Sequence, residues 1–254
     1  MSTLNDQVRA FWEQGPCGTN PGITGTIEPL SRDWFEQVER VRYEREPMIH
    51  GVAQFTRHGG QRILEIGVGA GTDHLQWARA GAECHGLDLT QAAIDTTAAR
   101  FKLYGFESNL QRHDAETIPF PDAHFDVVWS WGVIHHSETP ERIVAEIHRV
   151  LKPGGQFLGM FYKRRSLAVF KEWLKWAALR GKPWRSFADV LWHHFESVGT
   201  KAYEPHEMAR MFQAFGQFRC DIAMTPYDLQ HFPRWLHPWF PQGWGSFLDI
   251  TATK

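Results

Sequence analysis

The sequence predicts an α/β fold built around a parallel sheet, and three observations support this prediction. From residue 62 onward, short β-branched runs alternate with helical patterns, which is typical of consecutive βαβ units. A glycine-rich turn, EIGVGAGTD at residues 65–73, overlaps the end of the first run. The length of 254 residues suits one large domain with extensions, because single hydrophobic cores stop growing only near ~250 to 300 residues.

The expected elements are taken in chain order. Strands are predicted at residues 62–66, 83–88, 108–114, 125–130 and 155–162, followed by two closing strands at 218–224 and 246–254. The third strand has the weakest pattern. A helix is predicted over 139–151, where apolar residues recur at helical spacing, Thr139 can cap the start and the sequence KPGG marks the end. Another helix is expected over 203–216.

The segments outside the alternating pattern divide the chain into four parts. Residues 1–60 predict an N-terminal helical lid, with one helix around Phe11 and one across residues 31–55, joined by a Gly, Pro and Thr-rich stretch. Residues 61–162 form the expected ligand-binding core, and 163–202 a helical insertion. Residues 203–254 complete the core and carry an aromatic segment before the last strand.

Composition and charge argue against several classes of protein. The chain has 27 Lys and Arg against 29 Asp and Glu, so no overall positive field indicates nucleic acid as a partner. The three cysteines form no CxxC pair, which argues against a disulfide framework or a cysteine zinc site and suits a reducing compartment. No apolar run reaches the ~18 residues of a membrane span or forms a leader peptide. We therefore expect a cytoplasmic protein without an integral membrane segment.

The glycine-rich turn indicates a nucleotide-containing cofactor. Gly67, Gly69 and Gly71 give the pattern G-x-G-x-G, whereas a nicotinamide fingerprint would place its third glycine where this chain has Thr72. Asp88, at the end of the second strand, can accept hydrogen bonds from both hydroxyls of an adenosine ribose, which serves NAD and S-adenosylmethionine equally. At the end of the third strand, Asp114, followed by Ala115 and Glu116, can accept a hydrogen bond from an adenine amino group.

Five motifs in order resemble those of the class I S-adenosylmethionine-dependent methyltransferases. They are EIGVGAGTD, GLDLT, DAETIPFPDAHFDVV, GVIHH and RVLKPGG, and they cover roughly residues 60–162. The resemblance implies methyl transfer from S-adenosylmethionine. It also implies a Rossmann-like, doubly wound sheet of seven strands, mostly parallel with an antiparallel last strand, which agrees with the two closing strands read from the pattern.

The resemblance also implies which residues bind the cofactor. The loop would lie against the methionine and ribose portions, Asp88 would hold the ribose hydroxyls, and Asp114 would face the adenine amino group. Leu89 would cover the adenine ring, Ala115 would supply a backbone contact, and Ser130 and Trp131 would border the methionine end. The full expected set is Tyr43, Glu65, Gly67, Gly69, Gly71, Asp88, Leu89, Asp114, Ala115, Glu116, Ser130 and Trp131.

The flanking phrases FWEQGPCGTN, RYEREP and FESVGTKAYEPHEM resemble a bacterial branch of these enzymes whose acceptors are mostly unassigned. This likeness suggests that Phe11, Trp12, Cys17 and Gly18 belong to a lid over the active site. It also suggests that Tyr43 reaches the methionyl end of the cofactor. Ordinary packing of the first helix on the sheet is an equal alternative for Phe11 and Trp12.

His135 and His136 follow the fourth strand, where a general base could stand. Histidine suits proton removal near neutral pH, so His135 is the candidate catalytic residue. Packing of the loop before Thr139 is the alternative. The expected acceptor contacts are Phe11, Trp12, His135, His136 and Tyr162. No metal site is expected, because adjacent histidines point in different directions and lack a third ligand at the usual spacing.

The acceptor itself is predicted only as a class. Seven of the 12 tryptophans, Trp173, Trp176, Trp184, Trp192, Trp235, Trp239 and Trp244, lie in the insertion or the late aromatic segment and could wall the acceptor pocket or pack the insertion. Lys171 and Lys175 share one face of a basic helix, with Leu167, Phe170, Leu174 and Ala177 on another. That face could be solvated, attract an anion or rest on an anionic membrane.

We therefore expect methyl transfer to a small-molecule, anionic or amphiphilic acceptor of a biosynthetic pathway. The alternatives are a methyltransferase-like module that binds the cofactor without turnover, and a nicotinamide oxidoreductase, which Thr72 and Asp114 oppose. The sequence predicts neither the oligomeric state nor the atom that is methylated.

Overall fold

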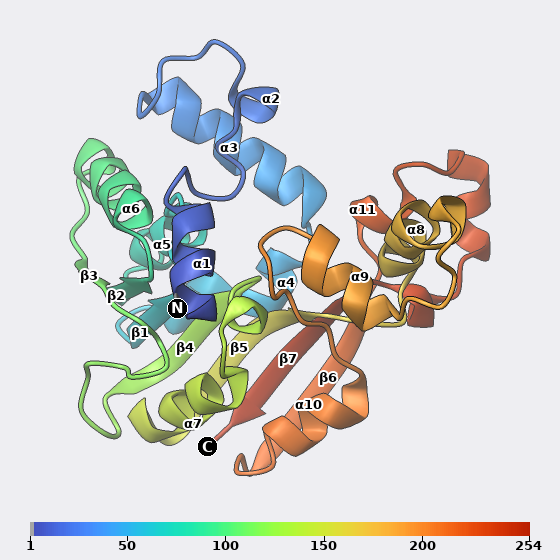
Figure 1. Ribbon diagram of the computed structural model, residues 1–254. Helices are drawn as coiled ribbons and strands as arrows, with labels where there is room; N and C mark the ends of the chain where they lie inside the picture. The colour runs from blue at the N-terminus through green and yellow to red at the C-terminus, as the bar shows by residue number, and fades with distance from the viewer. Residues whose placement is uncertain (1–2) are drawn as a thin grey trace.

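The computed structural model describes residues 3–254 and is built on a seven-stranded sheet with helices on both faces (Figure 1). The strands are β1 Arg62–Ile66, β2 Glu83–Asp88, β3 Asn109–Arg112, β4 Phe125–Trp131, β5 Leu151–Tyr162, β6 Gln217–Ala223 and β7 Phe247–Thr253. Their order is β3-β2-β1-β4-β5-β7-β6. Only β7 runs against its neighbours, as the antiparallel register with β5 and β6 shows. The predicted fold class is confirmed.

The helices are α1 Leu4–Trp12, α2 Pro21–Thr24, α3 Arg32–Arg45, α4 Ile49–Ala53, α5 Thr72–Arg79, α6 Gln91–Tyr104, α7 Pro140–Val150, α8 Leu167–Trp176, α9 Phe187–His194, α10 Pro205–Met211 and α11 Pro226–Leu229. Short 3₁₀ turns accompany them at Phe55–His58, Ile134–His136 (η2), Ala178–Arg180, Arg234–Trp239 and Gln242–Trp244. Among the described residues, none of these helices combines the length and apolarity that crossing a bilayer requires.

Each strand of the central sheet sends alternate side chains to opposite faces. In β1, Leu64 and Ile66 join the cluster that α7 and α10 cover, whereas Ile63 joins the cluster beneath α4, α5 and α6. This period of two is that of a strand buried on both sides. The two packed faces hold the strand ends in place and leave the loops at their carboxyl ends free to form a site.

The single helix expected across residues 31–55 is wrong, because the chain breaks between α3 and α4. Glu46 has φ −130° and ψ 60°, outside the helical region. It precedes Pro47, and a proline ring clashes with a helical conformation of the residue before it. The break lies at Glu46, whose side chain reaches Trp131 of β4.

Two helix ends also differ from expectation. KPGG does not end the helix over 139–151: α7 ends at Val150, and Leu151 is already extended and pairs with Phe125 of β4, so KPGG lies within β5. The helix expected over 203–216 is shorter, since α10 ends at Met211. Strand pairing thus decides the end of α7 more strongly than the local turn residues do.

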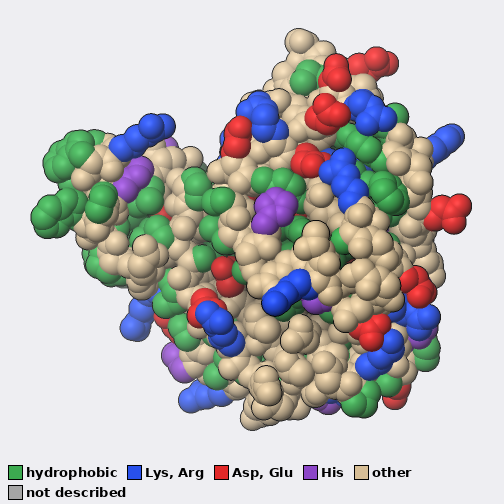
Figure 2. Space-filling model, turned by 180° about the vertical axis from the view of Figure 1, so that it is seen from behind, with side chains coloured by type: hydrophobic (Ala, Val, Ile, Leu, Met, Phe, Trp, Pro, Cys, Tyr) green, Lys and Arg blue, Asp and Glu red, His purple; other side chains and the backbone are tan. Residues whose placement is uncertain are grey.

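An outer lobe consists of α8, α9, α11 and residues 230–245, and it stands beside the sheet (Figure 1). Hydrophobic side chains gather on its surface (Figure 2), and Trp184, Trp235 and Trp239 are each more than 70% exposed. None of the seven tryptophans of this region lines the cavity described below, so the expectation that they wall the acceptor pocket is wrong. Trp173 and Trp176 instead pack within the lobe, where Trp173 donates to the Arg185 carbonyl at 2.7 Å and Trp176 stacks on His194.

Candidate functional site

A cavity of about 710 Å³ lies at the carboxyl ends of β1, β2 and β4, between α1, α3 and the outer lobe. Its wall includes many of the residues predicted to bind cofactor or acceptor: Trp12, Glu65, Gly67, Gly69, Asp88, Leu89, Asp114, Ala115, Trp131, His136 and Tyr162. Cys17 and Gly18 of the predicted lid also line it. The parallel strands bring these residues together because their carboxyl ends share one edge of the sheet.

The glycine-rich loop forms one wall of the cavity, and two of its positions require glycine for different reasons. Gly67 has φ +82°, and a Cβ there would lie 2.2 Å from the Val133 side chain, so this glycine allows close packing within the protein. Gly69 has φ +53°, and a Cβ there would meet no protein atom within 4 Å. Gly69 thus faces open cavity and lets the backbone approach a ligand.

Asp88 ends β2 with its carboxylate held by the backbone. It accepts hydrogen bonds from Gly69 N at 3.2 Å, Thr90 N at 2.9 Å and the Thr90 hydroxyl at 2.8 Å. Burial nevertheless raises the pKa of Asp88. Since a carboxylate has about four lone-pair sites, Asp88 can still accept from a ligand hydroxyl.

Replacing Asp88 by Ala should weaken S-adenosylmethionine binding by about 1.5 to 3 kcal/mol, the usual contribution of hydrogen bonds to a charged group. Titration calorimetry measures this directly. Asp95→Ala, on the exposed side of α6, is the matched control and should bind as the unmodified protein does. Equal affinity of the two variants would remove the ribose role from Asp88.

Glu65 is an uncharged acid beside the loop. Its Oε2 lies 3.1 Å from His74 Nδ1. On the other side of the ring, His74 Nε2 lies 2.8 Å from the Ser108 hydroxyl, which donates its hydrogen bond to the Cys84 carbonyl. Burial lowers the pKa of His74 to about 3, and burial together with Asp73 and Asp88 raises the pKa of Glu65 well above its usual range. Neutral His74 therefore donates a hydrogen bond to the Ser108 hydroxyl through Nε2 and accepts one at Nδ1 from the protonated carboxyl of Glu65.

Helix α1 is fastened to the predicted adenine end of the cavity. Asn5 Nδ2 donates to both Asp114 Oδ2 and Glu116 Oε1 at 2.9 Å, and its Oδ1 accepts from Glu138 N at 2.7 Å. Glu116 also receives the Ser137 hydroxyl at 2.5 Å. Glu116 thus ties three segments together and lies outside the cavity wall, whereas Asp114 lies in it.

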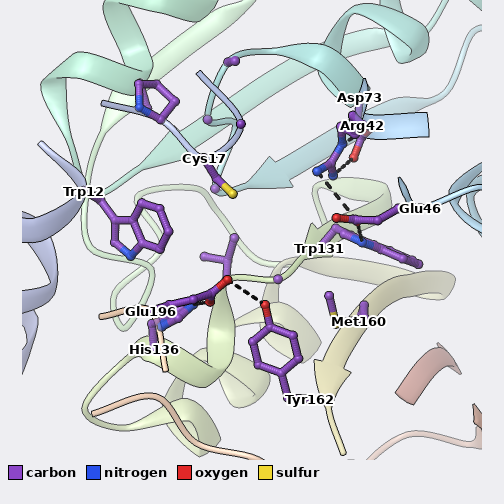
Figure 3. Close-up of a pocket in the computed structure, with 18 of the residues that line it drawn as sticks. Trp12, Cys17, Arg42, Glu46, Asp73, Trp131, His136, Met160, Tyr162 and Glu196 are labelled. Carbon is purple, nitrogen blue, oxygen red and sulfur yellow. Dashed lines mark hydrogen bonds and ion pairs between the residues drawn. The ribbon is translucent and has the colours of Figure 1, made fainter. Parts of the chain in front are cut away.

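A buried ion pair that the sequence analysis missed closes the opposite end. Asp73, 2% exposed, accepts Arg42 Nη2 at 2.5 Å and Nε at 3.0 Å, together with the Tyr43 hydroxyl at 3.1 Å. Glu46 accepts Trp131 Nε1 at 2.5 Å and lies 3.8 Å from Arg42 (Figure 3). Arg42 and Glu46 belong to the motif RYEREP, and Asp73 is the last residue of EIGVGAGTD. The sequence therefore contained the charged residues of this ion pair but did not indicate that they meet.

The remaining wall is apolar and aromatic with a few polar atoms. Cys17, Tyr162 and Glu196 project toward one another from three segments (Figure 3). Burial raises the pKa of Tyr162 well above its usual range, and its hydroxyl donates to Glu196 Oε1 at 3.0 Å. Trp12 meets the His136 ring edge-on at 5.8 Å.

Six predicted site residues lie outside the cavity wall: Phe11, Tyr43, Gly71, Glu116, Ser130 and His135. Phe11 is 42% exposed on the outer side of α1. The Ser130 hydroxyl donates to the Ile66 carbonyl at 3.0 Å, and a Cβ at Gly71 would meet Thr97 at 2.9 Å. The Tyr43 hydroxyl donates to Asp73 Oδ1 at 3.1 Å. His135 is fully buried behind His136, so a base role for it stays a prediction.

The structure bears on the three alternatives that the sequence leaves open for the basic helix. Lys171 does not lie on a solvated face: its Nζ donates to the Tyr227 carbonyl at 2.8 Å and the Asp228 carbonyl at 3.0 Å, and it lines the cavity together with Lys175. Phe170 and Leu174 instead are 46% and 40% exposed. Helix α8 turns this way because Asp228 accepts from its first turn at Ala168 N.

Comparison with known proteins gives one matching family model and several relatives. Residues 64–159 match the family described as "Methyltransferase domain". The phthiotriol/phenolphthiotriol dimycocerosates methyltransferase of Mycobacterium tuberculosis is 38% identical over 112 residues, which is 43% of this chain and 41% of that protein. The fatty-acid O-methyltransferase of Mycolicibacterium smegmatis is 33% identical over 132 residues, 51% of this chain and 47% of that protein.

A solved structure extends the likeness of the fold to nearly the whole chain. The geranyl diphosphate C-methyltransferase of Streptomyces coelicolor A3(2), in a complex that contains S-adenosyl-L-homocysteine, has a TM-score of 0.63 at 14% identity and covers 99% of this chain and 97% of its own. The sequence matches to the two curated relatives span less than half of their lengths. S-adenosylmethionine is the expected cofactor of a domain of this kind.

Proposed function

Since the chain belongs to the class I S-adenosylmethionine-dependent methyltransferases, we propose that it transfers the methyl group of S-adenosylmethionine to a small anionic amphiphile. The observation that carries the proposal is the continuity of the cavity. The loop of Gly67 and Gly69 and the acids Asp88 and Asp114 line one part of it, and an apolar chamber with Lys171 at its edge forms the other.

The cofactor part supplies position more than chemistry. A sulfonium is already a strong electrophile, so the protein's task is to hold the acceptor atom about 3 to 3.5 Å from the methyl carbon and exclude water. Such positioning can contribute roughly 7 to 11 kcal/mol. We assign the expected contacts of the sequence analysis to those residues that line the cavity, with Asp88 on the ribose and Asp114 on the adenine.

The acceptor part favours a molecule with an apolar body and a negative head. Met160, Tyr162, Val169, Phe195 and Phe247 supply apolar and aromatic surface to the wall. The ammonium group of Lys171, in the outer lobe, is held in place by hydrogen bonds to two backbone carbonyls. An ammonium group has three protons, so one remains for an anion in the cavity. The two curated relatives named above act, by their names, on a lipid and on a fatty acid, which supports the same class.

The test is a panel of acceptors with one variable at a time. Fatty acids, alkyl phosphates, and the matching neutral alcohols and methyl esters are incubated with S-adenosylmethionine, and release of S-adenosylhomocysteine is measured. The proposal expects turnover with the anionic members and little with the neutral ones. Turnover confined to neutral acceptors would contradict it. Binding of S-adenosylmethionine without turnover of any acceptor would favour a module that only binds the cofactor. Binding of NADH, measured by calorimetry, would favour an oxidoreductase.

Replacing Lys171 by Gln should lower kcat/KM for an anionic acceptor about 10-fold or more, because a hydrogen bond to a charged group contributes about 1.5 to 3 kcal/mol. Added salt should reduce the difference in kcat/KM between the variant and the unmodified protein only slightly, because Lys171 is half-buried and salt screens surface charges more strongly. Lys182→Gln, an exposed residue of the same lobe, is the control and should leave kcat/KM unchanged. Equal values for both variants would leave Lys171 with a structural role only.

A further inference from the structure

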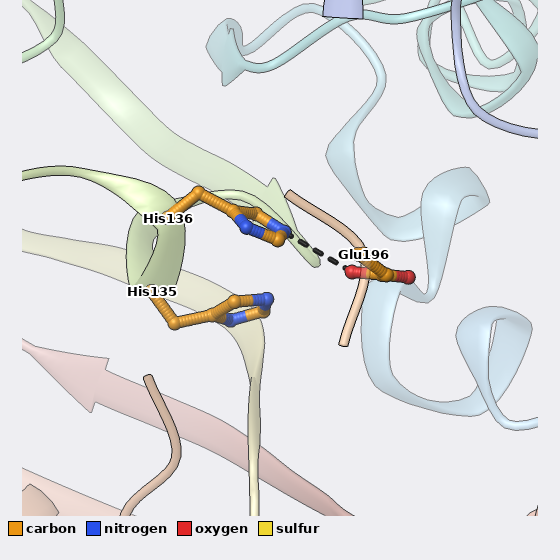
Figure 4. Close-up of side chains that lie close together, drawn as sticks. All are labelled: His135, His136 and Glu196. Carbon is orange, nitrogen blue, oxygen red and sulfur yellow. Dashed lines mark ion pairs between the residues drawn. The ribbon is translucent and has the colours of Figure 1, made fainter. Parts of the chain in front are cut away.

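Two histidines and one carboxylate meet at the acceptor end of the cavity. Ligand atoms of His135, His136 and Glu196 all lie within 4.8 Å of one another (Figure 4). The sequence argument that adjacent histidines point apart is wrong here: the rings of His135 and His136 leave turn η2 on the same side, with centroids 4.5 Å apart. The third group, Glu196, comes from the insertion, 60 residues further along the chain than His136.

His136 Nδ1 lies between two hydroxyls, and its Nε2 faces the Glu196 carboxylate. The Thr200 hydroxyl donates to the Ser197 carbonyl at 2.7 Å, so its oxygen is free to accept from His136 Nδ1 at 3.1 Å. The hydroxyl of Ser197 lies 2.9 Å from the same nitrogen. His136 Nε2 lies 3.2 Å from Glu196 Oε2. In the tautomer with the proton on Nδ1, the Nε2 lone pair points at this oxygen, and a cation between the two atoms would bind both.

His135 adds a second, independent sign of a missing partner. Its side chain is fully buried, and neither ring nitrogen has a hydrogen-bond partner within the described residues. A neutral imidazole always has one donor and one acceptor nitrogen, and leaving such groups unpaired in the interior costs free energy. Glu196 itself has φ +55°, a conformation that is uncommon for a residue other than glycine and that concentrates at functional sites.

We propose that His135, His136 and Glu196 bind a divalent transition-metal ion whose open positions face the acceptor. A metal to ligand distance of about 2.1 Å from both His136 Nε2 and Glu196 Oε2 gives an angle of roughly 100°, which suits tetrahedral or octahedral coordination. Two imidazoles with one carboxylate favour Zn²⁺, Fe²⁺ or Co²⁺ over Mg²⁺, which prefers oxygen ligands. Ser197 and Thr200 orient His136 from behind.

The part of this inference that concerns the acceptor rests on the proposed function. His136, Glu196 and Tyr162 line the cavity, so the ion would be reached from the chamber assigned to the acceptor. A bound ion can orient an acceptor oxygen and stabilise negative charge on it. Metal binding itself requires no acceptor and can be measured on the protein alone.

The experiment uses Co²⁺ as the probe, because its ligand-field absorption reports nitrogen and carboxylate coordination. Protein dialysed against a chelator is titrated with CoCl₂, and MgCl₂ serves as the hard-ion comparison. We expect one Co²⁺ per chain and no displacement by Mg²⁺. His136→Gln and Glu196→Gln should weaken Co²⁺ binding at least about 100-fold, and Ser197→Ala about 10- to 100-fold, as for residues that orient a metal ligand.

His193→Gln, an exposed histidine of another adjacent pair, is the matched control and should bind Co²⁺ like the unmodified protein. Circular dichroism and calorimetry with S-adenosylmethionine show that each variant is folded. Absence of saturable Co²⁺ binding, or equal binding by Glu196→Gln and His193→Gln, overturns the proposal and leaves a His136 to Glu196 ion pair. Specific Co²⁺ binding in a protein that methylates no acceptor upholds the metal site and counts against the proposed function alone.

Discussion

Replacing Gly69 by Val should abolish measurable binding of S-adenosylmethionine while the protein still folds. At φ +53° a side chain is strained by about 1 to 2 kcal/mol, more for a β-branched one, but it meets no protein atom within 4 Å. The added carbons enter the cavity where the loop approaches the ligand. Calorimetry measures the loss of affinity, and thermal unfolding shows that the fold persists.

Gly81→Val separates the strain from the occupied space. Gly81 has φ +83° and equally open surroundings, but it lies outside the cavity wall. The two variants should lose similar stability, and only Gly69→Val should lose cofactor affinity. Normal binding by Gly69→Val would mean that this part of the loop is only a turn.

Replacing Arg42 by Gln should lower the free energy of unfolding by about 3 to 5 kcal/mol, which is the usual cost of removing one partner of a buried ion pair. The substitution leaves the Asp73 carboxylate, 2% exposed, without its cation. Because Arg42 belongs to α3 and Asp73 to the start of α5, the substitution also removes one of the contacts that hold α3 against the glycine-rich loop. Guanidinium unfolding measures the change.

Arg40→Gln on the same helix is the control. Arg40 pairs with Glu44 at 2.8 Å, but both side chains are more than half exposed, and surface pairs contribute only about 0 to 1 kcal/mol. Equal destabilisation by the two substitutions would contradict the importance given to the buried pair.

The sheet and the cofactor part of the cavity could be predicted because their determinants are local. A strand followed by a glycine-rich turn places the turn at a carboxyl strand end, and period-two burial predicts which faces are covered. All seven strands were expected within a few residues of where they lie. The order of the motifs also predicts that Asp88 and Asp114 lie at that edge.

The acceptor part could not be predicted because its members come together only through tertiary packing. Glu196 reaches His136 from the insertion, and the periodicity of neither segment indicates the meeting. Lys171 turns inward because Asp228, 57 residues later, holds the start of its helix. The number of tryptophans is also a misleading guide, because it suggested a pocket wall, whereas Trp235 and Trp239 are exposed on the surface.

The two parts of the cavity have separate origins in the chain. The part that we assign to the cofactor comes largely from residues 65–132, within the region that matches the family. The part that we propose for the acceptor is assembled from α1 and its following loop, the insertion and the aromatic segment before β7. Insertions and exchanges in those outer segments leave the strand ends untouched. A module of this kind can therefore diversify toward new acceptors by changing its peripheral segments, which agrees with a family match confined to residues 64–159.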